Sequence, residues 1–149
     1  MASFPAGVTA VTAFDENGRP RGLTLVAFCG VSLEPPLVLV SVALHSNTLP
    51  AIRARGGFTV NFLAAGSRHR AELLATKSED KFEQLAWRAP AAPEGGPILH
   101  EDAAAYIVCR TWREVPAGDH VVFLGEVLDG ATVPGQLPLV YHQREYREV

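Results

Sequence analysis

The sequence has little of several features that mark particular classes of protein. It contains only two cysteines, Cys29 and Cys109, and neither belongs to a Cys-x-x-Cys pair. Each lies in an apolar run with strand character, so we expect two small buried thiols rather than a disulfide. No run of lysine and arginine occurs and the formal net charge is −3. The basic footprint of a nucleic-acid-binding protein is therefore absent.

Long hydrophobic runs are also missing. The longest apolar stretch, Leu37 to Leu44, is broken at Ser41 and is far shorter than the roughly 20 residues that a membrane-spanning helix needs. Met1 to Gly7 lacks the basic region and apolar core of a secretory signal. We therefore expect a cytoplasmic protein that does not associate with a membrane.

Side chains for metal binding or covalent catalysis do not occur in recognisable patterns. The sequence has no G-x-S-x-G motif, and its five histidines form no i, i+4 pair and no cluster with cysteine. The histidines are His45, His69, His100, His120 and His142. We expect no metal site and no catalysis by a side-chain nucleophile.

What the sequence does contain is enough apolar material for one substantial core. The chain has 149 residues, of which 48% are hydrophobic and 19% charged. This length is typical of one domain, so we treat residues 1–149 as a single domain. Some of the apolar surface suits a subunit contact, because obligate homodimer interfaces resemble a core cut in half.

The patterning favours strands over helices. Strand-like segments are expected at Val8 to Phe14, Gly22 to Leu33, Leu37 to Leu44, Phe58 to Leu63, Ala103 to Glu114, His120 to Leu128 and Leu139 to His142. Short helices are expected at Leu49 to Arg55, Ser67 to Ala75 and Ser78 to Leu85, and a mobile loop at Ala89 to Pro97. No helix of ten or more residues separates the strands, which argues against a parallel sheet. The pattern predicts an all-β dominated fold, a closed or nearly closed antiparallel barrel of six to seven strands with short inserted helices.

Three segments are candidates for a binding site, and each has a structural alternative. Ser46-Asn47-Thr48 precedes a short helix, where it either caps the helix or binds a phosphate. The small residues from Gly22 to Phe28 permit either close packing or the approach of a flat ligand. Asn61 is either a core amide satisfied by the backbone or a donor to a polar ring edge.

The motifs in their order resemble the flavin reductase-like family. Members of this family are FMN-binding split barrels and include the reductase components of two-component flavin monooxygenases. The matching motifs are Phe4-Pro5-x-Gly7-Val8-Thr9, Gly22-Leu23-Thr24-x-x-Ala27-Phe28-x-x-Val31-Ser32-Leu33-x-Pro35-Pro36, Ser46-x-Thr48, Phe58-x-Val60-Asn61-x-Leu63, Lys81-Phe82, Gly118-Asp119-His120 and Pro138-Leu139-x-Tyr141-His142. The similarity covers nearly the whole chain.

The resemblance implies a role for individual residues. The isoalloxazine edge of FMN or FAD would face the backbone of Thr24, Leu25, Val26 and Ala27. The flavin phosphate would be held by Ser41, Ser46, Asn47 and Thr48. The flavin would be lined by Asn61 and Leu63 and covered by Lys81 and Phe82, and His120 would contact the nicotinamide nucleotide.

The implied activity is an NAD(P)H-dependent flavin reductase that works as a homodimer and supplies reduced flavin to a partner monooxygenase. Hydride would pass from NADH or NADPH to the flavin without a catalytic side chain. One alternative is a flavin-binding electron-transfer protein without efficient NAD(P)H turnover. Another is a non-catalytic split barrel that binds a different planar cofactor such as heme.

The sequence departs from the family pattern at a few positions. His45 stands where an arginine or lysine is common before the Ser-x-Thr motif, and Val26 and Gly30 stand where serine is common. Arg144 replaces a usual glycine. These differences predict looser flavin binding, as suits a flavin that acts as a substrate.

Overall fold

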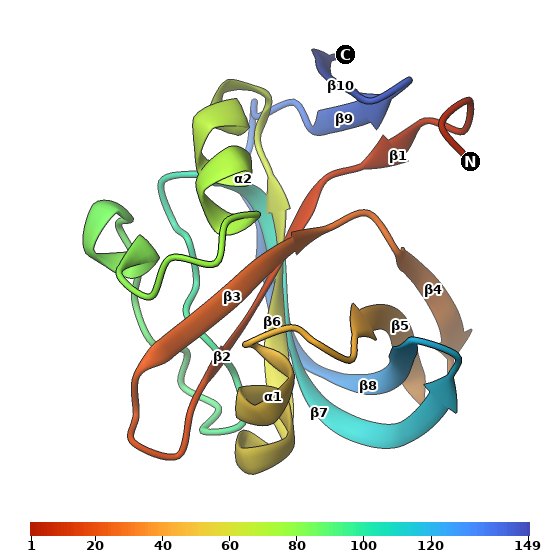
Figure 1. Cartoon of the computed structure of the whole chain (residues 1–149), viewed down its shortest axis with the longest axis vertical. Coiled ribbons are helices and arrows are strands. Elements are labelled where there is room, and N and C mark those ends of the chain that lie inside the picture. Colours follow the sequence, from red (N-terminus) through yellow and green to blue (C-terminus); the bar gives the residue numbers. More distant parts are fainter.

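The computed structural model describes residues 1–149 and contains ten strands and two α-helices (Figure 1). The strands are β1 (Ala6–Gly7), β2 (Thr9–Phe14), β3 (Pro20–Leu25), β4 (Phe28–Leu33), β5 (Pro36–Ala43), β6 (Gly57–Leu63), β7 (Ala103–Ala117), β8 (His120–Thr132), β9 (Leu139–His142) and β10 (Glu145–Glu148). The helices are α1 (Leu49–Arg55) and α2 (Arg68–Leu74), with 3₁₀ turns η1 (Ala65–Ser67) and η2 (Lys81–Gln84). Both α-helices have seven residues, too few to traverse a bilayer.

The main sheet has seven strands in the order β3-β2-β6-β7-β8-β5-β4, and all neighbouring pairs are antiparallel. The sheet is strongly curled, and a small second sheet of order β1-β9-β10 brings the two ends of the chain together (Figure 1). The expected architecture, mostly antiparallel β with short inserted helices, is therefore confirmed.

The predicted strand from Gly22 to Leu33 is wrong, because the structure divides it into β3 and β4. These two strands form opposite edges of the same sheet, since β3 pairs only with β2 and β4 pairs only with β5. Val26 and Ala27 carry the chain between the edges and are exposed. The two residues that connect the strands therefore belong to neither strand.

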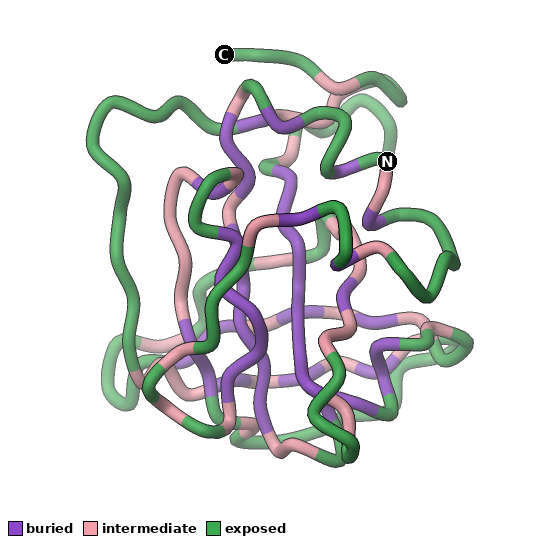
Figure 2. Tube along the Cα trace, turned by 90° about the vertical axis from the view of Figure 1, so that its left-hand side faces the viewer, coloured by how far each residue is buried: buried purple, intermediate pink, exposed green.

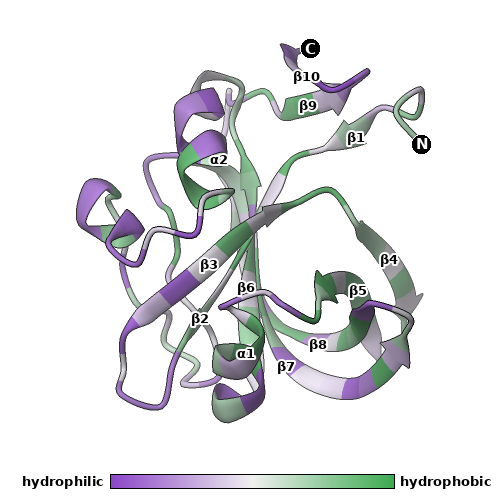
Figure 3. Ribbon diagram, in the orientation of Figure 1, coloured by the Kyte–Doolittle hydropathy of each residue, from purple (hydrophilic) through white to green (hydrophobic).

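The apolar side chains form two clusters. The larger lies within the curled sheet beneath α1 and contains Val11, Phe58 and Phe123, all fully buried. The smaller packs α2 and η2 against the strands and includes Leu74 and Leu99. Figure 2 shows buried segments along the central strands, and Figure 3 shows hydrophilic residues at the outer turn of the β2–β3 hairpin.

Some element boundaries differ from the prediction. The segment predicted as a helix from Ser78 to Leu85 contains only η2, whose N-cap position is Asp80. Ser67 precedes α2 but makes no cap bond, because its hydroxyl donates to the Asp102 carbonyl at 2.9 Å. β7 and β8 extend beyond their predicted ends to form one long hairpin, and β1 and β10 were not predicted.

The two cysteines have different surroundings. Cys109 is buried as expected, and burial raises the pKa of its thiol to about 12. Cys29 is exposed, so the expectation of a second buried thiol is wrong. Its strand, β4, is an edge strand with a neighbour on one side only, which leaves most of its residues accessible to solvent.

Candidate functional site

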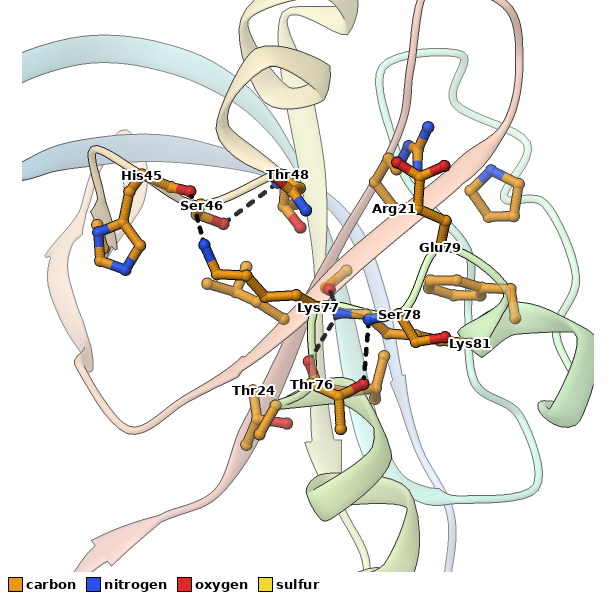
Figure 4. Close-up of a pocket in the computed structure, with 18 residues that line it drawn as sticks. Arg21, Thr24, His45, Ser46, Thr48, Thr76, Lys77, Ser78, Glu79 and Lys81 are labelled. Carbon is orange, nitrogen blue, oxygen red and sulfur yellow. Dashed lines mark hydrogen bonds between the residues drawn. The ribbon is translucent and has the colours of Figure 1, made fainter.

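One pocket, here called the polar pocket, gathers residues from three segments that are distant in sequence (Figure 4). These segments are residues 20–24 on β3, residues 43–48 between β5 and α1, and residues 74–82 between α2 and η2. Its volume is about 190 Å³. Whole ligands of drug size usually occupy about 300–1,000 Å³, so this pocket suits one polar end of a larger ligand.

Hydrogen bonds from side chains to the backbone hold the walls of the polar pocket together. The Thr24 hydroxyl donates to the Ala71 carbonyl at 2.6 Å, which ties β3 to α2. The Lys81 ammonium donates to the carbonyls of Gly22 and Leu74, both at 2.9 Å. Lys81 is half-buried, and burial, followed by repulsion from Arg21, lowers its pKa. These bonds make Lys81 a structural link between β3 and the end of α2.

Gly22 permits close packing on this wall. A Cβ atom there would lie 2.9 Å from the ring of Phe82, which is closer than real Cβ contacts allow. Phe82 is buried and belongs to the smaller apolar cluster. Of the two roles that the sequence left open for this glycine, the structure shows the packing role.

The opposite wall presents hydroxyl groups at the start of α1. The Ser46 hydroxyl oxygen accepts a hydrogen bond from the Thr48 backbone N–H at 3.2 Å. The Thr48 hydroxyl makes no capping bond, although Thr48 is the N-cap residue and lines the pocket. Helix capping by Thr48 is thus not what the structure shows, and its hydroxyl remains available to a ligand.

Six of the predicted site residues line this pocket together: Thr24, Ser46, Asn47, Thr48, Lys81 and Phe82. The other predicted residues lie elsewhere and fall into three groups. Leu25 ends β3, Val26 and Ala27 connect β3 to β4 and are here called the strand crossing, and Ser41 lies on β5 beside them. Asn61 and Leu63 lie in the interior, and His120 lies at the start of β8.

The strand crossing continues directly from Thr24, which lines the pocket. Neither Val26 nor Ala27 donates a hydrogen bond from its backbone N–H within the chain, and both residues are exposed. The Ser41 backbone N–H donates to the Ala27 carbonyl at 3.2 Å, which places β5 beside the crossing. The crossing therefore offers two free main-chain donors next to the polar pocket.

Asn61 and Leu63 contribute no surface to the pocket, because both are fully buried. The Asn61 amide donates to the carbonyls of Ala10 and Pro97, both at 3.2 Å, and its oxygen accepts from the Leu99 N–H at 2.9 Å. The geometry thus shows the core role that was left open for Asn61. Leu63 belongs to the smaller apolar cluster.

His120 lies at the rim of the site. It is paired across the sheet with Ala43, which lines the pocket. Its ring is 2.7 Å from the Asp119 carboxylate, and this hydrogen bond is the largest cause that lowers the pKa of Asp119. The ring therefore has a local anchor and remains partly exposed.

Sequence reasoning missed one side of the pocket, formed by Arg21, Thr76, Lys77, Ser78 and Glu79. Most of these residues belong to the polar run that follows α2. Such a run between two helical patterns indicates a loop, which was the available signal.

Comparison with known proteins identifies the family. The model of the flavin reductase like domain matches residues 1–149. The chain belongs to the flavin reductase-like family. The resemblance inferred from the motifs is therefore confirmed, and it holds over the whole chain.

Curated relatives support this membership. The chain is 40% identical over 146 residues to a flavin reductase (NADPH) from Lentzea aerocolonigenes, covering 98% of this chain and 84% of the relative. It is 37% identical over 147 residues to a flavin reductase (NADH) from Kitasatospora aureofaciens, covering 98% and 76%.

Solved structures of this family share the fold. The NADH:FAD oxidoreductase SgcE6 from Streptomyces globisporus C-1027, in complex with NAD and FAD fragments, superposes with a TM-score of 0.90. It is 34% identical, and the match covers 98% of this chain and 86% of that protein. The flavin reductase PheA2 gives a TM-score of 0.88 at 34% identity, with 100% and 93% covered.

Proposed function

We propose that this chain reduces free flavin with NAD(P)H and passes the reduced flavin to a separate monooxygenase. The chain is an NAD(P)H:flavin oxidoreductase, and its substrates are NADH or NADPH and FMN or FAD. The observation that carries this conclusion is the family match over the whole chain. The delivery to a monooxygenase is supported by relatives such as a trigonelline monooxygenase reductase component from Acinetobacter baylyi, 35% identical.

The residues of the site fit a flavin with a phosphate tail. At about 190 Å³ the polar pocket is smaller than a usual site for a whole ligand and suits the phosphate end of the flavin, and Ser46, Asn47 and Thr48 supply polar groups to it. The tricyclic ring would lie outside the pocket over the strand crossing, where the free N–H groups of Val26 and Ala27 can donate to its polar edge. When bound, flavin accepts a hydride from the nicotinamide ring, and the chain contributes orientation and hydrogen-bond donors.

A coupled assay tests the activity. Purified protein mixed with NADH or NADPH and free FMN should lose absorbance at the nicotinamide band much faster than the same mixture without protein. No consumption above background with either nucleotide would defeat the proposal. Tight flavin binding without nucleotide oxidation would favour the electron-carrier alternative instead.

We also propose that the protein is a cytoplasmic homodimer. Large apolar side chains are exposed on β4 and β7, among them Val31, Leu33 and Trp112. Leu33 is 95% exposed, and together with its exposed neighbour Val31 on β4 it suits a subunit contact. Size-exclusion chromatography with multi-angle light scattering at micromolar concentration should give twice the mass of one chain, and the mass of a single chain would contradict the dimer.

Thr48→Val should weaken the binding of FMN by about tenfold, because it removes one hydroxyl donor to a charged phosphate and keeps the side-chain volume. Riboflavin lacks the phosphate, so its dissociation constant should not change. The measurement is quenching of flavin fluorescence. Thr111→Val is a matched control, since the Thr111 hydroxyl is buried without a partner and Thr111 does not line the pocket. Equal losses for both flavins would contradict the role given to Thr48.

His120→Ala should raise the KM for NADH several-fold with little change in flavin affinity. The ring stands at the rim of the pocket, where a second substrate would approach a flavin already bound. Steady-state kinetics at saturating FMN give the KM, and fluorescence titration gives the flavin affinity. A variant with normal KM and weakened flavin binding would show that His120 contacts the flavin and not the nucleotide.

A further inference from the structure

Three cationic side chains line the polar pocket, and two of them are already engaged. The Arg21 guanidinium pairs with the Asp15 carboxylate at 3.3 Å. Lys81 donates two of its three N–H groups to the backbone carbonyls of Gly22 and Leu74. The Asp15 carboxylate therefore offsets the charge of Arg21, and Lys81 cannot turn toward a ligand without breaking its bonds to the carbonyls of Gly22 and Leu74.

The third cation, Lys77, has almost no interactions within the chain. It is exposed and forms no ion pair with any carboxylate of the chain, Glu79 on the same pocket wall included. Its only hydrogen bond is a long one, 3.5 Å from the ammonium to the backbone carbonyl of His45. Lys77 therefore has no carboxylate partner and at least two uncommitted N–H donors.

The Lys77 ammonium also lies beside the part of the pocket where Ser46 and Thr48 present their hydroxyl groups. Its side chain leaves the segment after α2 and crosses the mouth toward the segment that carries Ser46 (Figure 4). Because the Ser46 oxygen accepts the Thr48 N–H, the Ser46 hydroxyl proton is free to point into the same space. One ammonium and two hydroxyl groups thus converge there from opposite walls.

We propose that Lys77 is the cation that binds the flavin 5′-phosphate, by exchanging its contact with the His45 carbonyl for a bond to the phosphate oxygens. This inference rests on the proposed function and adds to it the residue that discriminates phosphorylated flavins from riboflavin. Bound in this way, the phosphate joins the segment after α2 to the segment before α1. Lys81 is then a positioning residue that holds the wall from which Lys77 projects.

Chemical labelling offers a direct test, because Lys77 and Lys81 are the only two lysines of the chain. The free protein is treated with an amine-acetylating reagent, and the two lysine sites are quantified by mass spectrometry. Lys77 should react faster than Lys81, whose ammonium is half-buried. FMN at ten times its dissociation constant should slow acetylation of Lys77 about tenfold, whereas saturating riboflavin should leave it unprotected. Equal acetylation of Lys77 with and without FMN would overturn the assignment.

Binding by variants gives an independent readout. Lys77→Met should raise the dissociation constant of FMN about tenfold or more and leave that of riboflavin unchanged, while Lys77→Arg should recover most of the FMN affinity. Arg147→Gln removes one positive charge on β10, outside the pocket, and should bind FMN as the parent protein does. Parental affinity in Lys77→Met, or equal loss of both flavins, would contradict the proposal.

The two levels of the proposal fail in different ways. If the parent protein oxidises NAD(P)H with flavin but Lys77 is not protected, the reductase function stands and the phosphate role of Lys77 is wrong. If the parent protein neither binds FMN nor oxidises NAD(P)H, both are wrong.

Discussion

Asn61→Ala is expected to reduce the free energy of unfolding by about 3 to 5 kcal/mol. The Asn61 amide is fully buried, and it satisfies carbonyls of Ala10 and Pro97 and the N–H of Leu99. Alanine would leave the Leu99 N–H unpaired in the interior, where an unsatisfied group costs about 1 to 3 kcal/mol, and would also remove the amide bonds to the two carbonyls. The Pro97 carbonyl would keep its bond from the Thr12 hydroxyl at 2.7 Å. Urea denaturation followed by circular dichroism measures the change.

A control separates this structural role from a role in flavin binding. Asn17→Ala changes the same residue type in the exposed β2–β3 turn, and its effect should stay within about 0.5 kcal/mol. The folded Asn61→Ala protein should bind FMN with parental affinity, because the side chain contributes no surface to the pocket. Loss of flavin affinity with unchanged stability would restore the flavin-lining role that the family resemblance implied.

Local sequence signals predicted some elements to the residue. The helix expected from Leu49 to Arg55 is α1 with the same ends. Pro50 suits the first turn of a helix, and Gly56 adopts φ 74°, the left-handed conformation that ends one. Both signals act within a few residues of the element that they define, which is why the sequence alone was sufficient.

The separation of β3 from β4 depends on long-range strand pairing, which the sequence pattern does not reveal. Nothing between Gly22 and Leu33 has the turn chemistry that separates β3 from β4. The division is imposed by the partners β2 and β5, which lie at different positions in the sheet. A strand pattern reports which residues are extended, but it does not report which neighbour they bond.

In the candidate site, too, the sequence predicted some residues and only the structure revealed others. The motifs carrying Ser46, Thr48 and Lys81 were recognised through the family, and the structure places them around one pocket. The family motif singled out Lys81 as a residue over the flavin, and no sequence pattern singled out Lys77. Only the contacts of their ammonium groups distinguish the committed lysine from the available one.

The segment from Gly95 to Leu99 also differs from its prediction, and a substitution at Gly96 tests how this segment packs. The sequence predicted a mobile loop at Ala89 to Pro97, yet its last three residues are buried. The Thr59 hydroxyl bonds to both the Gly96 carbonyl at 2.8 Å and the Gly96 N–H at 3.0 Å. A Cβ atom on Gly96 would overlap the backbone of Thr12 and Ala13 on β2, which cannot move aside as a flexible side chain can.

Gly96→Ala is therefore expected to reduce the free energy of unfolding by about 3 kcal/mol or more, because the clash with backbone must separate the segment from β2 or shift the strand. Gly66→Ala is the matched control: Gly66 is exposed, and a Cβ there would meet nothing within 4 Å, so its effect should stay within about 0.5 kcal/mol. Urea denaturation of both variants gives the comparison.

Since β2 also pairs with β3, which carries one wall of the pocket, the Gly96 variant should lose flavin affinity together with stability. Parental stability in Gly96→Ala would mean that this segment does not pack on β2, and the buried role of Asn61, which depends on the same segment, would be lost with it.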